Sequence, residues 1–467
     1  MFSKSPKITM TLLLMILLLF TGCPAADNSE PTAQEPPSAV TQQPVTVAED
    51  TPATDSPASV DDNLKTMVKL LAQPVLPEAT DRFDWEAKDK LREDNPVDTE
   101  FMTALNTFAV RTSTAVLHEN GVNRNFSPLS LYYALALAAS GAEGQTQKEL
   151  LDLLGAADTV KLAEQSGNLY RLLFTDNEVT KLQIANSLWI DNDLEVTGAY
   201  TQNAVKHFYA WVFAADFTDP ATAMAAARWV AANAKGTIEP QITLDANTVM
   251  LILNTVYFYD EWQKGFEKAQ TAESEFELAG DDKVTCDFMQ AEYGMKKYYQ
   301  DAGFMRTELE LKGGGVMSFI LPDKDVKVDS LLADAARLQT ALTGGEEKAA
   351  KMFFKMPKFK YGYESKLVEI LKTLGISDAF DDQADFSGID GKRDLYISDV
   401  IQQTHIGVDE NGVEAAAFTQ VSIATMSMPI TLEETVEFFL ERPFIYTITS
   451  REGALLFVGV CDNPRLD

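Results

Sequence analysis

The chain has 467 residues and a formal net charge of −31, and 46% of its residues are hydrophobic. This length allows one large domain or two to three ordinary ones, each with a sizeable core. The negative charge argues against nucleic-acid binding, which needs a basic surface to replace counterions. The three histidines lack metal-ligand spacing, so we expect no metal and no cofactor.

Residues 1–22 have the pattern of an export signal. Two lysines precede an apolar core at residues 10–20, which is too short to cross a bilayer as a stop-transfer helix. A Thr-Gly pair then leads to Cys23, and this pattern resembles the bacterial lipoprotein cleavage box. The resemblance implies an exported protein that is lipid-anchored through Cys23 to the bacterial cell envelope or surface. The alternative is plain secretion with a chance cysteine.

Two segments separate this signal from the main domain. Residues 23–63 are rich in Pro, Ala, Thr, Gln, Ser and Asp and almost lack large apolar side chains, so they cannot offset the entropy of ordering. We interpret them as a disordered tether that spans about 30–40 Å on average. Residues 64–100 form an N-terminal extension in which we predict one short helix followed by extended chain.

A globular domain is predicted from Phe101 to residue 467. Apolar residues at helical spacing predict helices near residues 101–116, 130–140 and 149–154. A run of small residues around Trp229 predicts another helix at residues 221–233. Alternation or continuous apolar runs predict strands at residues 181–190, 249–259, 399–409, 444–448 and 454–460. Helices gather early and strands late, which favours an α+β fold with mixed sheets in one domain.

The stretch from Glu410 to Pro429 has an unusual strand pattern. Its period-two alternation places small or β-branched residues on one side, namely Val413, Ala415, Ala417, Thr419, Val421 and Ile423. Alanine is depleted in ordinary strands because it offers little to pack. We interpret the stretch as a strand that can enter a narrow slot in a sheet, although it also fits an edge strand followed by a loop.

Four motifs, taken together, resemble the serpin family over residues 101–467. They are Asn125-Phe-Ser-Pro-Leu-Ser130 with Gly141-Ala142, the segment Asn254-Thr-Val-Tyr-Phe-Tyr-Asp-Glu-Trp262, the hinge Glu410-Asn-Gly-Val-Glu-Ala-Ala-Ala417, and Arg442-Pro443-Phe444 with Asn463-Pro464. The resemblance implies the serpin fold, with three β-sheets, eight or nine helices and an exposed reactive loop. It also implies a monomer that is not an enzyme.

The resemblance further implies suicide-substrate inhibition of serine endopeptidases. The protease cleaves the loop and forms a covalent acyl-enzyme complex, and the freed loop then inserts into the main sheet and traps it. Serpin loop insertion is a known case of strand addition to a β-sheet. The alternative within the family is a non-inhibitory member that acts as a binding or scaffold protein on the cell envelope. A Ser-His-Asp hydrolase is disfavoured because no nucleophile-elbow motif is present.

The family pattern assigns roles to residues of the loop. The hinge comprises Glu410, Gly412, Val413, Glu414, Ala415, Ala416 and Ala417, and it contains no proline. Counting from Glu410 places the reactive bond at Met426-Ser427, which implies elastase-like, chymotrypsin-like or subtilisin-like targets. The segment after Met428 is longer than is typical, and counting back from Arg442 moves the bond towards Leu432.

The family pattern also identifies residues that control opening of the main sheet. These residues are Trp262, Lys358, Ser127, Ser130, Asn254 and Gln402. Lys358 corresponds to the lysine that pairs with Glu410 at the base of the loop. Gln402 stands where the family has a histidine, and an amide can still donate and accept hydrogen bonds there. Cys286 and Cys461 are expected to be buried thiols, which could pair only if the fold brings them together.

Overall fold

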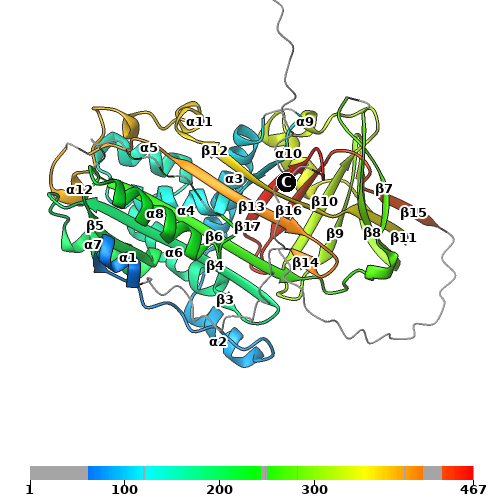
Figure 1. Cartoon of the computed structure of the whole chain (residues 1–467), viewed down its shortest axis with the longest axis horizontal. Coiled ribbons are helices and arrows are strands. Elements are labelled where there is room, and N and C mark those ends of the chain that lie inside the picture. Colours follow the sequence, from blue (N-terminus) through cyan, green and yellow to red (C-terminus); the bar gives the residue numbers. More distant parts are fainter. Residues whose placement is uncertain are drawn as a thin grey trace, which may run out of the picture. The chain divides into compact units, whose positions relative to one another are not determined.

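The computed structural model describes residues 62–118, 121–238, 240, 242, 244, 248, 250–280, 282–393, 395–413 and 434–465. Within these residues there are twelve α-helices, two short 3-10 helices and seventeen strands (Figure 1). The α-helices are α1 Asp62–Met67, α2 Trp85–Asp94, α3 Thr99–Val116, α4 Pro128–Ala139, α5 Gly144–Leu154, α6 Thr159–Leu173, α7 Gly198–Phe208, α8 Pro220–Asn233, α9 Val328–Leu331, α10 Ala335–Thr343, α11 Val368–Thr373 and α12 Ser387–Asp390. The 3-10 helices are η1 Lys268–Gln270 and η2 Asp378–Phe380.

The strands include the five predicted at residues 181–190, 249–259, 399–409, 444–448 and 454–460, whereas most of the stretch from Glu410 to Pro429 lies outside the described residues. They are β1 Lys69–Ala72, β2 Arg124–Phe126, β3 Thr175–Asp176, β4 Thr180–Asp191, β5 Ala210–Ala215, β6 Met250–Glu261, β7 Ala272–Glu277, β8 Lys283–Asp301, β9 Phe304–Glu310, β10 Val316–Pro322, β11 Glu346–Pro357, β12 Phe359–Lys366, β13 Ile401–Val408, β14 Gly412–Val413, β15 Thr435–Phe439, β16 Phe444–Thr449 and β17 Leu455–Cys461. The predicted α+β class with mixed sheets is therefore confirmed.

Helix α4 begins where local chemistry favours a helix start. Ser127 has extended backbone angles, and its Oγ accepts a hydrogen bond from the Ser130 N–H at 3.3 Å, which caps the first turn. Pro128 occupies the first helical position, where its missing N–H costs nothing. The helix is buried almost all round and packs against β6 and β17, so it lies beneath the middle of the sheet that β6 belongs to.

The first sheet has the strand order β1-β5-β4-β6-β14-β13-β12, with β3 paired to β4. Its two faces belong to different cores because side chains alternate along each strand. Ile184 and Leu188 of β4 join the main core, whereas Ala185 and Trp189 join a second cluster on the opposite face. Helix α8 supplies Trp229 and other residues to that second cluster, so the sheet is covered on both faces.

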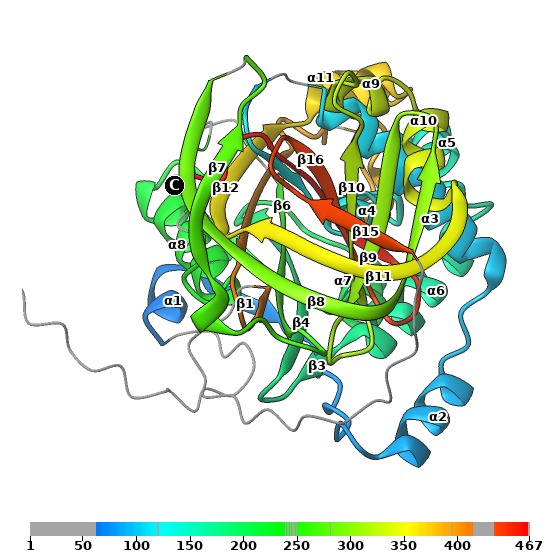
Figure 2. The ribbon, with the colours of Figure 1, turned by 90° about the vertical axis from the view of Figure 1, so that its right-hand side faces the viewer.

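The second sheet has the order β15-β11-β8-β9-β10-β16-β17-β2, with β7 paired to β8. Strands β8 and β11 run side by side as long curved strands (Figure 2). Three sheets were expected, but the described residues form two hydrogen-bonded networks. The reason is the length of β8, because its 19 residues pair with β7 at one end and β9 at the other, joining two sheets into one.

The N-terminal extension contains more structure than was predicted. The expected short helix is α1, but strand β1 and a second helix, α2, were not anticipated. Strand β1 pairs with β5 at the edge of the first sheet, and Leu64 and Val68 are buried in the Trp229 cluster. No helix in the described part of the chain is long and apolar enough to cross a membrane.

Candidate functional site

The hinge begins as a short strand held between two longer ones. Gly412 and Val413, which form β14, pair with Glu261 and Asp260 of β6 on one side, and Val413 pairs with Val408 of β13 on the other. Val413 is 1% exposed and belongs to the main core. Its side chain therefore points inward, as the alternation predicted from the sequence requires.

Gly412 is necessary because β6 approaches it too closely for a side chain. A Cβ at this position would lie 2.1 Å from the carbonyl oxygen of Asp260 and 2.7 Å from the Cα of Glu261. Both contacts involve backbone atoms, which cannot move aside as a flexible side chain would. Glycine thus permits β14 to enter the sheet at this position.

Trp262 fastens the turn that leads into β14. Its indole Nε1 donates to the carbonyl oxygen of Asp409 at 2.9 Å, and its backbone N–H donates to the carbonyl oxygen of Asn411 at 2.9 Å. The Asp409 carboxylate accepts from the Asn411 N–H at 2.7 Å, which shapes the turn locally. Trp262 is 1% exposed, so the same residue packs in the core and holds the turn through its hydrogen bonds.

Glu410 is buried and has several partners. Its Oε2 lies 3.1 Å from Nζ of Lys358, and its Oε1 accepts from Oγ1 of Thr271 at 2.8 Å. Burial acts to raise the pKa of Glu410, but hydrogen bonds from its own N–H, Thr271 and Lys358 outweigh burial and lower the pKa. The carboxylate is therefore ionised at neutral pH and ties the turn to the residue between β11 and β12.

A chain of polar contacts crosses the first sheet below β14. Gln402 of β13 accepts from the Ser127 N–H and donates to the Ser127 carbonyl oxygen, both at 2.9 Å. Ser130 Oγ hydrogen-bonds to the side chain of Asn254 on β6, and Asn254 hydrogen-bonds in turn to Asn186 on β4. The N-terminal turn of α4 thus connects β13 with β6.

Below β14, strands β6 and β13 are separated by a slot. In the described residues, β6 pairs on this side only through Asp260 and Glu261, so the edge from Met250 to Tyr259 has no strand partner. Two cavities lie between the strands, the first lined by Ile252, Asn254 and Gln402 among others. The second is lined by Val256, Phe258, His405, Ile406 and Val413, together with Thr237, Ile238, Ile448 and Phe457.

The structure brings eight predicted site residues together around this slot. They are Glu410, Gly412, Val413, Trp262, Lys358, Ser127, Asn254 and Gln402, with Ser130 joined to them through Asn254. The remaining predicted positions lie outside the described residues: Glu414, Ala415, Ala416, Ala417, Met426, Ser427 and Cys23. Cys461 is buried as expected, whereas Cys286 is only half-buried, and both are free thiols.

Three comparisons with known proteins bear on this arrangement. The family model described as serpin, serine protease inhibitor, matches residues 103–464. The chain belongs to the serpin family. A mouse relative, named as a serine protease inhibitor, is 30% identical over 73% of this chain and 83% of its own length. Human alpha-1-antichymotrypsin is 29% identical over 75% of this chain and 84% of its length.

Solved structures agree with this serpin assignment. The native state of tengpin, a thermophilic serpin, superposes with a TM-score of 0.71 and 26% identity over 84% of this chain and 99% of tengpin. The expected serpin fold is therefore confirmed, and serpin-type protease inhibition is supported by the family and by relatives named as protease inhibitors.

Sequence reasoning missed two residues at this site, Asp260 and Thr271, that have buried or partly buried hydrogen bonds in the structure. Asp260 is 2% exposed and accepts hydrogen bonds from Thr180 Oγ1 at 2.9 Å and from the Gly313 N–H at 3.0 Å. Burial raises the pKa of Asp260 to about 7. Thr271 was missed as the second partner of Glu410. A signal for Asp260 existed, because a carboxylate in a continuous apolar strand needs buried partners.

Proposed function

We propose that this serpin inhibits serine endopeptidases by letting them cleave its reactive loop and then inserting that loop between β6 and β13. The observation that supports the proposal is the position of β14 between β6 and β13. Gly412 and Val413 already pair with β6, Val413 also pairs with β13, and an unpaired strand edge continues from Tyr259 to Met250 in the described residues. A segment that follows Val413 in alternation would extend this strand into the slot.

The free energy of such insertion is large enough to drive trapping of the protease. The apolar side chains Val421 and Ile423 would each contribute about 1.5–3 kcal/mol on burial. On the order of a dozen ladder hydrogen bonds would each add a net of about 0.5–1.5 kcal/mol. The sum is on the order of 10–20 kcal/mol, which rivals the usual stability of a whole domain, about 5–15 kcal/mol. The uninserted form is then metastable, and cleavage releases the difference.

The proposed reactive bond is Met426-Ser427, outside the described residues. Met426 would enter the primary specificity pocket of an elastase-like, chymotrypsin-like or subtilisin-like protease. Support for a chymotrypsin-like target comes from the relative whose name is alpha-1-antichymotrypsin. Because thioether oxidation makes methionine polar, oxidised protein should inhibit more weakly.

The test is covalent capture. The full chain is incubated with chymotrypsin, elastase and subtilisin, each active or with its catalytic serine chemically blocked, and is analysed on denaturing gels. A stable high-mass complex that requires active protease supports inhibition. Clean loop cleavage without a complex would instead indicate a non-inhibitory serpin. Mass spectrometry of the released peptide separates Met426-Ser427 from a bond near Leu432.

We propose further that Cys23 anchors this serpin by a lipid to the bacterial cell envelope. The support is the export pattern of residues 1–22 followed by Thr-Gly-Cys. Cys23→Ser should move the protein from the membrane fraction to the soluble fraction and abolish incorporation of labelled fatty acid. Unchanged labelling of the Cys23→Ser protein would refute the anchor while leaving the inhibition proposal intact.

A further inference from the structure

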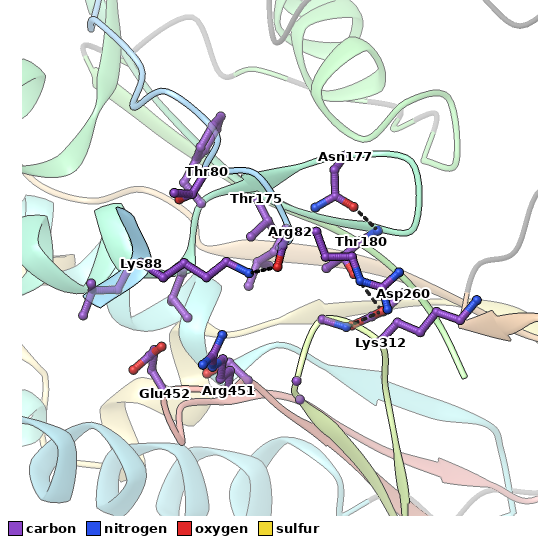
Figure 3. Close-up of a pocket in the computed structure, with 18 of the residues that line it drawn as sticks. Thr80, Arg82, Lys88, Thr175, Asn177, Thr180, Asp260, Lys312, Arg451 and Glu452 are labelled. Carbon is purple, nitrogen blue, oxygen red and sulfur yellow. Dashed lines mark hydrogen bonds between the residues drawn. The ribbon is translucent and has the colours of Figure 1, made fainter. Parts of the chain in front are cut away.

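A large cavity lies beneath the N-terminal extension and shares the lining residue Phe258 with the second cavity of the slot. It has a volume of about 460 Å³ (Figure 3). Its walls come from the segment that leads into α2, the β3–β4 hairpin, the end of β6 and two turns at residues 312–315 and 450–452. Its floor is apolar and consists of the buried side chains of Phe174, Leu182, Phe258 and Leu456.

Cationic side chains dominate the rim of this cavity. Five line it, namely Arg82, Lys88, Arg92, Lys312 and Arg451, against two carboxylates, Asp260 and Glu452. Arg92 is paired with Glu452 at 3.0 Å, and Lys312 is paired with Glu261. Over the part of the chain that the structure describes, no carboxylate lies within 4.0 Å of the charged groups of Arg82, Lys88 or Arg451. This arrangement is unexpected in a chain with a net charge of −31.

Two of these cations lie against the same aromatic ring. Lys88 Nζ lies 5.0 Å and Arg451 Cζ 5.3 Å from the centre of the Trp85 ring, where the ring quadrupole attracts both. Lys88 Nζ also donates to the carbonyl oxygen of Arg82 at 2.6 Å, which fixes its direction (Figure 3). Partial burial, and then the nearby charges of Arg451 and Arg92, lower the pKa of Lys88.

The carboxylate of Asp260 on the opposite wall forms no ion pair with these three cations in the part of the chain that the structure describes. Asp260 is directed at Thr180 and the Gly313 N–H, which already use its oxygens (Figure 3). Glu452 is engaged by Arg92. The cavity therefore offers three cations that repel one another, hydroxyl groups of Thr80 and Thr175 nearby, and an apolar floor. An anion with a compact carbon skeleton would relieve the repulsion and fill the space.

We propose that this cavity binds a small organic polyanion that carries two or more carboxylate or phosphate groups, with Arg82, Lys88 and Arg451 as its charged ligands. Arginine is suited to bidentate contacts with either group, and lysine acts as a point charge. The volume lies within the usual range of small-molecule sites, about 300–1,000 Å³. No described residue of the hinge lines this cavity, so binding here can be assayed separately from the proposed inhibition.

Isothermal titration calorimetry of the full chain with citrate and with ATP tests the proposal and separates the carboxylate from the phosphate source. Binding of at least one probe is expected, together with an increase in the thermal unfolding midpoint, because a ligand of the folded state stabilises it by mass action. Affinity should fall steeply with added salt. Failure of both probes to bind at millimolar concentration would overturn the proposal.

Matched variants identify the ligand residues. Lys88→Met and Arg451→Met should each weaken binding by about tenfold or more, since a hydrogen bond to a charged group is worth roughly 1.5–3 kcal/mol. Lys90→Met is the control, because Lys90 is exposed on the same helix and does not line the cavity. Equal loss of affinity in Lys90→Met, or no loss in the other two variants, would contradict the assigned site.

Discussion

Gln402 and Ser127 form a closed pair in which one side-chain amide satisfies both backbone groups of one residue. The amide accepts from the Ser127 N–H and donates to its carbonyl oxygen, both at 2.9 Å, and both residues are buried. Because Ser127 also caps α4, the pair holds β13 to the helix beneath the sheet. Insertion of a strand between β6 and β13 would have to separate the contacts that lead from here to Asn254.

Replacing Gln402 should therefore destabilise the uninserted serpin. Gln402→Leu leaves the buried N–H of Ser127 without its partner, whereas the Ser127 carbonyl oxygen still accepts from the Leu131 N–H, and we expect a loss of about 1–3 kcal/mol. The midpoint of the first denaturant-induced unfolding transition measures the loss. Gln403→Leu on the same strand is the control, because among the described residues its side-chain amide hydrogen-bonds only to the exposed Glu364. Equal effects of the two substitutions would contradict the role assigned to Gln402.

The ion pair of Lys358 with Glu410 should show a coupling energy of about 1 kcal/mol in a double-mutant cycle of Lys358→Met and Glu410→Gln. The Lys358 side chain is 36% exposed, so solvent screening keeps the coupling small. The pKa of Glu410 is lowered in the folded protein, so its contribution is present at neutral pH and is lost as pH falls through the range where carboxylates protonate. A coupling that persists when Glu410 is protonated would refute the ionic interpretation.

Gly412→Ala should disturb the pairing of β14 with β6. The added Cβ would meet backbone atoms of Asp260 and Glu261, and relieving such contacts costs about 1–3 kcal/mol. We expect a lower unfolding midpoint and slower loop insertion after cleavage. Gly294→Ala is the matched control, because a Cβ there meets no atom within 4 Å and Gly294 also lies in a strand. Unchanged stability of Gly412→Ala would mean that β14 is not held against β6.

Asp260 should make stability depend on pH in the opposite sense to an ion-paired carboxylate. Its pKa is raised to about 7 in the folded protein from an ordinary value of 3.8, so the folded state binds the extra proton between these values. Stability is therefore greatest below this range and falls as pH rises. Relative to Asp260→Asn, wild-type stability should fall by about 4 kcal/mol between about pH 4 and pH 8. Parallel pH profiles of unfolding for the two proteins would contradict the shift.

The alternation of the loop predicts opposite outcomes for two neighbouring substitutions. Val413 faces the core, so Ala415 belongs to the inward set, and Ala415→Arg would bring a charge into the sheet. It should convert the inhibitor into a substrate that is cleaved without a stable complex. Ala416→Arg, on the outward set, should retain most inhibition. The ratio of complex to cleaved protein on denaturing gels measures both, and identical ratios would refute the alternation.

The elements that could be predicted from the sequence were those whose own pattern is strong. Helix α3 has apolar residues at helical spacing, and β6 has a continuous β-branched and aromatic run. Strand β1 could not be predicted, because Lys69–Ala72 is short and pairs with β5, which lies over a hundred residues away. The joining of two sheets by β8 likewise depends on partners distant in sequence.

The residues of the candidate site also divide into those that a sequence pattern identifies and those that only tertiary contacts identify. Family motifs identified Trp262 and Gln402, and both residues form buried or partly buried hydrogen bonds beside the slot. Thr271 and Asp260 were not identified, because their importance comes from tertiary contacts. A threonine after a 3-10 helix has no pattern that relates it to Glu410, and only the fold brings them to 2.8 Å.

Strand β1 also affects whether two molecules of this serpin can pair through the edges of their sheets. An uncovered edge strand offers a row of free backbone N–H and C=O groups to any neighbouring chain. Lys69 and Leu70 already occupy part of the edge of β5 by pairing with Ala214 and Phe213. The same extension that supplies the cavity wall thus makes β1 the edge strand, and a four-residue edge strand that begins with a lysine is a poor template for intermolecular pairing. Loss of residues 62–72 should favour aggregation at that border even where each molecule remains folded.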